Sequence, residues 1–147
     1  WDELDYKNDL WTIPAIRMKG KKEHLVPLTS QIKRLLDYIR QFNGEEDYVF
    51  WSPRNKARPH INESALNNHL KVGLGYGGKQ TAHGLRQLPL TAGQDVLDFP
   101  PEIIQRQMAH AIGDKIRMAY DKSQQLEERR MFMDAWSDAL ITHGLKV

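Results

Sequence analysis

The chain has 147 residues, of which 40% are hydrophobic and 27% charged, the proportions of a soluble globular domain. Its 21 Lys and Arg against 19 Asp and Glu give a net charge of +2, too small to identify a nucleic-acid partner by itself. Cysteine is absent, which excludes a disulfide framework and a thiolate metal site. The length of 147 residues predicts one domain. No apolar run reaches membrane-spanning length and no charged-then-apolar leader opens the chain, so we expect no membrane partner and a cytoplasmic location.

The first part of the sequence predicts a small antiparallel sheet. Leu10–Ile16 and His24–Pro27 are short runs rich in strand-forming residues, and a basic turn that contains Gly20 separates them. Residues 1–4 form a candidate third strand. Three short strands therefore come first in the chain.

After residue 28 the spacing of apolar residues changes to a helical period. Capping residues, Pro pairs and Gly mark helix starts near residues 30, 62, 81, 102, 113 and 124. The last helix carries an apolar stripe of Leu126, Met133, Trp136 and Leu140, which fits either a groove of its own domain or one on a partner protomer. The expected fold class is α+β, mainly α, with a small three-stranded antiparallel sheet packed beside a body of five or six helices.

One residue conflicts with the helical pattern. Pro89 lies inside the helix that Thr81 opens. Proline has no amide donor, and its ring clashes with the carbonyl four residues before it. We therefore expect this helix to kink or to begin late.

Five polar residues along the chain have complementary chemistry: Lys19, His83, Arg86, His110 and Tyr120. A tyrosine hydroxyl can attack a phosphodiester and keep the bond energy in a covalent intermediate, without a metal or cofactor. Arginine supplies the fixed positive charge that the transition state needs, and histidine and lysine can exchange protons with the attacking and departing oxygens. Taken singly, Tyr120 fits a core tyrosine and the two histidines fit structural roles.

Positive charge gathers in two segments. The first holds Arg17, Lys19, Lys21 and Lys22, and the second holds Arg54, Lys56 and Arg58. Charge alone fits solvated loops and a phosphate-facing surface about equally well. These residues are our candidate DNA contacts.

The ordered motifs resemble the tyrosine recombinases of the phage integrase family, in particular the prophage and genomic-island branch. The match extends from end to end and is carried by Trp11–Ala15, Arg17–Lys19, His24–Leu28, Thr81–Arg86, Met108–His110, Ala119–Asp121 and Glu127–Met131. Each motif alone is weak, and their order and spacing give the resemblance its weight.

The resemblance implies a role for each of the five polar residues. Tyr120 would be the nucleophile and would form a 3′-phosphotyrosyl link, while Arg86 would grip the non-bridging phosphate oxygens. Lys19, at a hairpin tip, would protonate the leaving oxygen. His83 would accept a proton and His110 would hydrogen-bond the phosphate. We expect His83, Arg86 and His110 to converge on one basic pocket, with Lys19 at its rim.

The resemblance also implies a function and an organisation. The function is site-specific DNA recombination, the integration or excision of a mobile element in the bacterial cytoplasm at the nucleoid. Residues 1–147 would be the C-terminal part of the catalytic domain, without the first catalytic Arg and the N-terminal DNA-binding domains, so the fragment alone is expected to be nearly inactive. The expected partners are double-stranded attachment sites and other integrase protomers in a tetramer on DNA, with host bending factors and an excision factor as further candidates. No metal or cofactor is expected.

Three alternatives stay open. A non-catalytic DNA-binding or recombinase-docking module is the main one, because one of two Arg clamps is missing. A metal site built from His60, His69, His83 and His110 is another, although their spacings match no compact ligand motif. A type IB topoisomerase shares the chemistry but fits the motifs at Met18–Lys19 and Glu127–Met131 less well.

Overall fold

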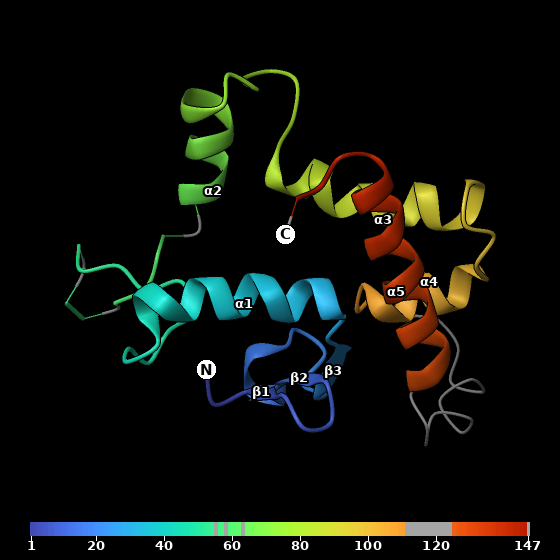
Figure 1. Ribbon diagram of the computed structural model, residues 1–147, viewed down its shortest axis with the longest axis horizontal. Coiled ribbons are helices and arrows are strands. Elements are labelled where there is room, and N and C mark those ends of the chain that lie inside the picture. The colour runs from blue at the N-terminus through green and yellow to red at the C-terminus, as the bar shows by residue number, and fades with distance from the viewer. Residues whose placement is uncertain (55, 58, 63, 111–124, 147) are drawn as a thin grey trace.

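The computed structural model describes residues 1–54, 56–57, 59–62, 64–110 and 125–146 (Figure 1). Three strands come first and five α-helices follow among these residues, so the fold is α+β and mainly α, as the sequence predicts. The elements are β1 (Leu4–Asp5), β2 (Leu10–Ile13), β3 (His24–Pro27), α1 (Ser30–Asn43), α2 (Ala65–Asn68), α3 (Ala82–Asp95), α4 (Pro101–Gln107) and α5 (Leu126–Thr142). No helix in the described ranges is both long and apolar enough to cross a membrane.

The predicted three-stranded antiparallel sheet is confirmed, with strand order β1-β2-β3. Leu10 pairs with Pro27 and Ile13 with His24, so β2 is the central strand and β3 an edge. The strand expected through Ile16 ends at Ile13. Pro14 follows it, and residues 15–17 form a 3₁₀ turn, because proline cannot donate to the ladder.

Helix α1 runs beside the sheet (Figure 1). Its start is fixed by Thr29, whose hydroxyl accepts from the Ile32 amide at 3.2 Å. At its other end the Trp1 indole donates to the Asn43 carbonyl at 2.9 Å. The Arg40 guanidinium also lies over the Trp1 ring, 4.7 Å from its centroid. The first residue of the chain is thereby packed against the last turns of α1.

Helices α3, α4 and α5 pack together and form the hydrophobic core of the described part of the chain. Ile103, Ile104, Met108 and Phe132 are buried there, with Phe132 fully buried. Gly93 of α3 lets the helices approach, since a Cβ on it would lie 2.8 Å from both Ile104 Cδ1 and Phe132 Cε2. The predicted stripe on α5 places Met133 and Trp136 only at the margin of this core, and Phe132 at its centre was not foreseen.

Helix α3 begins at Ala82 and continues through Pro89 to Asp95. The Thr81 hydroxyl accepts from the Gly84 amide at 2.9 Å and fixes this start. The expected late start is therefore wrong. A proline in mid-helix removes one amide donor, and the cap at Thr81 and the packing of Gly93 hold the rest of the helix.

The helix expected from Asn62 begins later than predicted, at Ala65. The Asn62 side chain accepts from the Ser64 amide at 2.8 Å, so it forms a local turn, and α2 begins only at Ala65. The chain continues from α2 as a π-helical turn over His69–Gly73 that buries Leu70. The helix expected at residues 113–120 lies outside the described residues.

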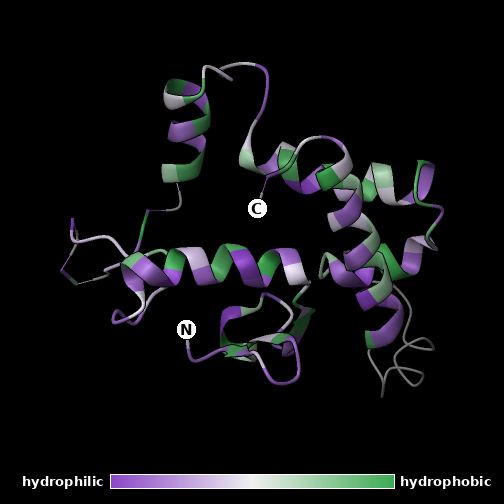
Figure 2. Ribbon diagram, viewed as in Figure 1, coloured by the Kyte–Doolittle hydropathy of each residue, from purple (hydrophilic) through white to green (hydrophobic). Residues whose placement is uncertain are grey.

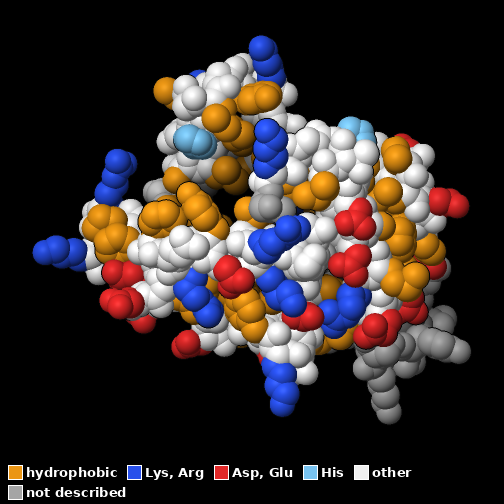
Figure 3. All heavy atoms as spheres, in the orientation of Figure 1, with side chains coloured by type: hydrophobic (Ala, Val, Ile, Leu, Met, Phe, Trp, Pro, Cys, Tyr) orange, Lys and Arg blue, Asp and Glu red, His pale blue; other side chains and the backbone are white. Residues whose placement is uncertain are grey.

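Helices α1 and α2 expose apolar side chains. Tyr38 and Phe42 are 60% and 69% exposed on α1, where apolar and polar residues are interleaved (Figure 2), and Val72 beyond α2 is 79% exposed. Hydrophobic side chains gather over this part of the molecule on the face shown in Figure 3. The described residues thus leave much apolar surface open on one side.

Helix α5 packs on its own chain in this structure. The Ser137 hydroxyl lies 3.1 Å from the Thr29 hydroxyl, and both residues are buried. At the surface, Gln31 donates to Asp138 at 2.9 Å. The apolar stripe of α5 was expected to fit either a groove of its own domain or a groove on a partner protomer. In this structure α5 lies in the groove of its own domain.

Candidate functional site

Arg86 and the turn after α4 are joined by a direct hydrogen bond. Arg86 lies in the second turn of α3, and its Nη2 donates to the Met108 carbonyl, two residues before His110. Two of the sequence motifs, separated by 22 residues in the chain, therefore meet. The turn 108–110 begins where α4 ends at Gln107.

The turn itself uses most of the free carbonyls at the end of α4. Met108 donates to the Ile104 carbonyl, Ala109 to Arg106 and His110 to Gln105, at 2.9 to 3.0 Å. Ala109 has φ 52°, the left-handed conformation that usually closes a helix. The amides of the turn donate to neither the Gln107 carbonyl nor the Met108 carbonyl.

Two cationic or titratable side chains lie against these two carbonyls. His24 Nε2 of β3 is 3.2 Å from the Gln107 oxygen, and Arg86 bonds the Met108 oxygen. The carbonyl end of a helix carries partial negative charge, so it favours such donors. Strand β3 and helix α3 therefore meet at the end of α4.

A third donor reaches Gln107 from α5. Arg129 is 1% exposed; its Nε donates to Gln107 Oε1 at 2.9 Å and its Nη2 to the Leu25 carbonyl. Gln107 is itself buried. A charged group removed from water needs such bonds, because its desolvation is otherwise very unfavourable. Arg129 thus connects α5 with α4 and β3.

Burial and charge both act on His24. Burial lowers its pKa below the ordinary 6.5, and the positive charges of Arg129 and then Arg86 lower the pKa further, while the bond to the Gln107 carbonyl opposes them. At neutral pH the imidazole is therefore neutral, and its Nε2–H tautomer can donate to that carbonyl.

The two predicted histidines are exposed. His83 lies three residues before Arg86 on α3 and therefore on the same face of the helix, with its Nε2 3.3 Å from the Gln87 amide nitrogen. His110 follows the turn that Arg86 contacts. The convergence of His83, Arg86 and His110 on one pocket stays a prediction.

The first basic segment lies in the connection between β2 and β3. Lys19, Lys21 and Lys22 are exposed there, and a Cβ on the neighbouring Gly20 would meet nothing within 4 Å. Arg17 is different, because it is paired with the Glu3 carboxylate. A phosphate would have to compete with Glu3 for it.

The second basic segment follows α1. Arg54 and Lys56 are exposed in a loop near the isolated bridge between Trp51 and His60. Arg58 and Tyr120 lie outside the described residues. The predicted role of each therefore stays a prediction.

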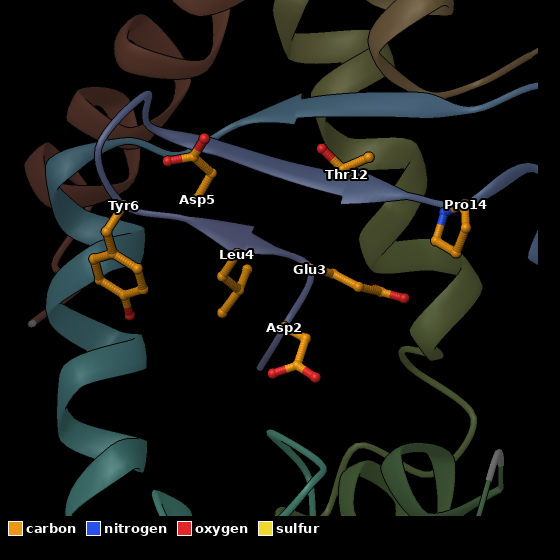
Figure 4. Close-up of a pocket in the computed structure, with 7 residues that line it drawn as sticks. All are labelled: Asp2, Glu3, Leu4, Asp5, Tyr6, Thr12 and Pro14. Atoms are coloured by element: carbon orange, nitrogen blue, oxygen red, sulfur yellow. The ribbon is translucent and has the colours of Figure 1, made fainter.

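The described residues also form a hollow beside β1, with a volume of about 520 Å³. Figure 4 shows its lining, which is drawn from β1, β2 and their flanks and consists of Asp2, Glu3, Leu4, Asp5, Tyr6, Thr12 and Pro14. Three carboxylates would repel a phosphate, and none of the predicted catalytic residues is among them. This hollow is not the candidate site.

In the described ranges no three His, Cys, Asp or Glu side chains are grouped so as to hold a metal ion. His60 lies beside Tyr48, with ring centroids 5.0 Å apart, whereas His83 contacts Gln87. The alternative of a histidine metal site therefore gains no support from these residues.

Three contributors to the site were not singled out in the sequence: His24, Gln107 and Arg129. One signal was available for Arg129. It lies three residues after Leu126 and four before Met133, so it is a charged residue on the apolar face of α5. Such a position indicates a buried, paired charge. His24 lies in one of the motifs that carry the resemblance, but neither it nor Gln107 shows a signal for this contact, because only the tertiary fold brings the two together.

The family model that matches this chain describes phage integrases, and three of its curated relatives are phage or prophage integrases. The model of the phage integrase family matches residues 1–127. Prophage integrase IntA of Escherichia coli K12 is 37% identical over 138 residues, which cover 94% of this chain and 33% of that protein. The integrase of enterobacteria phage P4 is 32% identical over 155 residues, covering 95% of this chain and 35% of that protein. The integrase of Shigella phage Sf6 is 32% identical over 140 residues, which cover 95% of this chain and 36% of that protein. The chain spans about a third of the length of these relatives, and no solved structure matches it.

Proposed function

Because the chain belongs to the phage integrase family, we propose that it is the C-terminal part of the catalytic domain of a tyrosine recombinase. Its reaction would be site-specific DNA recombination, the integration or excision of a mobile element through a 3′-phosphotyrosyl intermediate. The observation that carries the proposal is the bond from Arg86 to Met108, which joins the two motif segments that contain His83 and His110.

The chemistry assigns one role to each side chain. Tyr120 attacks the scissile phosphate, and His83 accepts the proton of its hydroxyl. Arg86 binds the non-bridging oxygens with the donors that the Met108 carbonyl does not use, and His110 adds a further hydrogen bond. Lys19, exposed between β2 and β3, protonates the departing 5′-oxygen.

The proposed partners follow from this reaction. Duplex DNA carrying an attachment site would contact the exposed lysines of the β2–β3 connection, together with Arg54, Lys56 and Arg58. Arg17 would join them only by exchanging Glu3 for a phosphate. Further protomers would complete a tetramer on DNA, with host bending and excision factors as accessory partners. The bacterial cytoplasm, at the nucleoid, is the proposed location.

The relatives are about three times as long as this chain, so we propose that an upstream part of the polypeptide supplies DNA-binding domains and a second catalytic arginine. Two arginines share the charge of the transition state. Removing one preorganised donor costs about 100-fold or more in rate. The 147-residue chain alone is therefore expected to cleave DNA very slowly.

The test uses the full-length protein and a nicked suicide DNA substrate that carries the element's own attachment site. The wild type is expected to form a covalent adduct with the DNA, and Tyr120→Phe to form none while still binding DNA. Tyr48→Phe is a matched control, because Tyr48 is a tyrosine beside the His60 ring outside the proposed site. An adduct that survives Tyr120→Phe would exclude Tyr120 as the nucleophile. DNA binding without any adduct in the wild type would favour the non-catalytic DNA-binding or docking module.

A further inference from the structure

We propose that Arg129 is a positioning residue for Arg86. Arg129 holds Gln107, and the next residue, Met108, presents the carbonyl to which Arg86 is bonded. In this way α5 sets the direction in which Arg86 offers its remaining donors to a phosphate. The inference rests on the proposed phosphate-binding role of Arg86.

The burial of Arg129 is the first step. An arginine that is 1% exposed occupies a place where an apolar side chain would usually pack at lower free energy. Two of its hydrogen bonds run to Gln107 Oε1 on α4 and to the Leu25 carbonyl on β3. A planar guanidinium with several fixed donors specifies the relative position of both acceptors. Arg129 therefore fixes α4 against β3.

The position of His24 supports the same conclusion. His24 precedes Leu25, and its Nε2 lies 3.2 Å from the backbone oxygen of Gln107. Residue 107 is therefore held twice, through its side chain by Arg129 and through its backbone by β3. The Met108 carbonyl one residue on has little freedom to move.

The Met108 carbonyl in turn orients Arg86. A guanidinium is rigid and planar, so a bond from one of its nitrogens restricts where the others point. Arg86 is an exposed residue, and this bond fixes one end of its guanidinium to the turn after α4. A shift of about 1 Å in a positioning contact can lower a catalytic rate about 100-fold. The loss of Arg129 should therefore act on cleavage more than on binding.

The neighbouring residue provides a matched control. Arg130 also connects α5 to the sheet region, through bonds of 3.4 Å to the carbonyls of Asp9 and Asn8, but in the part of the chain that the structure describes it makes no bond to Gln107. Arg129→Lys and Arg130→Lys both keep the charge and remove the fork of donors. Only Arg129→Lys should change the orientation of the Arg86 guanidinium.

The experiment measures single-turnover cleavage and DNA affinity of the full-length protein on the attachment-site substrate. Arg129→Lys is expected to cleave about 100-fold more slowly than the wild type. Its DNA affinity should stay within about threefold, because the exposed phosphate contacts are unchanged. Arg130→Lys is expected to cleave within about threefold of the wild type. Equal losses in the two variants, or wild-type cleavage by Arg129→Lys, would overturn the proposal.

Coupling to Arg86 separates positioning from a general loss of structure. In an Arg86→Lys background the effect of Arg129→Lys is expected to shrink from about 100-fold to about threefold, since the orienting bond is already altered. The same 100-fold loss in both backgrounds would mean that Arg129 does not act through Arg86. If Arg129→Lys does not fold, Gln107→Met, which keeps the side-chain length but removes the acceptor, replaces it with the same expected outcomes.

A spectroscopic measurement makes the inference independent of cleavage. The ¹⁵N–¹H signal of the Arg86 guanidinium, assigned by its loss in Arg86→Lys, is expected to shift in Arg129→Lys and to stay in place in Arg130→Lys. An unshifted signal in Arg129→Lys contradicts the positioning role. A shifted signal in a protein whose wild type forms no DNA adduct would support the positioning role and refute the proposed function.

Discussion

His24 lies half-buried between two arginines, and that position decides its protonation. Arg129 and Arg86 both disfavour the imidazolium, and burial does so more strongly than either. In the unfolded chain, in contrast, the imidazole is solvated and takes up a proton as the pH falls through about 6.5. Below that pH the unfolded state binds more protons than the folded state, so folding becomes less favourable as the pH falls.

The prediction is that the free energy of unfolding decreases between pH 7.5 and pH 5 by more in the wild type than in His24→Gln. Glutamine can still donate to the Gln107 carbonyl but does not titrate. Urea unfolding at several pH values measures both profiles. Because the pKa of His24 is lowered in the folded state, its contribution should be constant above about pH 7 and should fall below about pH 6.5. Parallel profiles for the two proteins would mean that His24 does not titrate differently on folding.

The residue scale also marks the limit of what the sequence could predict. Arg86 and His110 were predicted as site residues from motif order and residue type, and their roles stay predictions. His24 and Gln107 were not, because their roles depend on where β3 and α4 meet in three dimensions. For Arg129 the sequence could predict burial, because the residue lies on the apolar face of the last helix. The sequence could not predict its partners.

At the scale of elements, the turn that ends α4 carries local strain. Its closing residue, Ala109, has φ 52°, a conformation that costs an L-residue with a Cβ about 1–2 kcal/mol. Three amide hydrogen bonds of the turn hold it there, and the position is the one at which helices usually place glycine. In this strained turn the Met108 carbonyl points toward Arg86 and accepts its hydrogen bond.

We therefore predict that Ala109→Gly raises the free energy of unfolding by about 0.5–1 kcal/mol, because relief of strain exceeds the added entropy of the unfolded chain. The matched control is Ala92→Gly in the interior of α3, which should lower it by about 1 kcal/mol. Both values come from urea unfolding at neutral pH. A loss of stability in both variants would show that the turn is not strained at Ala109.

Element boundaries were predictable where a local chemical signal fixed them. Thr29 and Thr81 cap α1 and α3 as expected, and the Pro100–Pro101 pair opens α4. Asn62 misled the prediction, because the same side chain can form a turn with Ser64 in place of a cap. The choice between the two depends on tertiary packing, which local sequence does not contain.

At the scale of the whole molecule, the sheet with α1 forms one part and the α3–α5 body another (Figure 1). The contacts between them include several polar ones from α5. Arg129 reaches Leu25 in β3, and Ser137 reaches Thr29 at the start of α1. The spacing of apolar residues in the sequence predicts a docked helix. Buried polar contacts of this kind decide how the helix is placed along its groove, and hydrophobic spacing does not reveal them.

The contact between Ser137 and Thr29 should therefore contribute measurably to stability. Both side chains are buried, and the Thr29 hydroxyl also caps α1, so removing the Ser137 hydroxyl leaves a buried polar group without one partner. Ser137→Ala is predicted to lower the free energy of unfolding by about 1–2 kcal/mol. The adjacent Asp138→Ala removes the exposed bond to Gln31 from the same helix and should change it by less than about 0.5 kcal/mol. Urea unfolding of the two variants measures both changes in the free energy of unfolding. Equal changes would show that the buried Ser137–Thr29 contact stabilises the docking of α5 no more than the exposed Asp138–Gln31 contact.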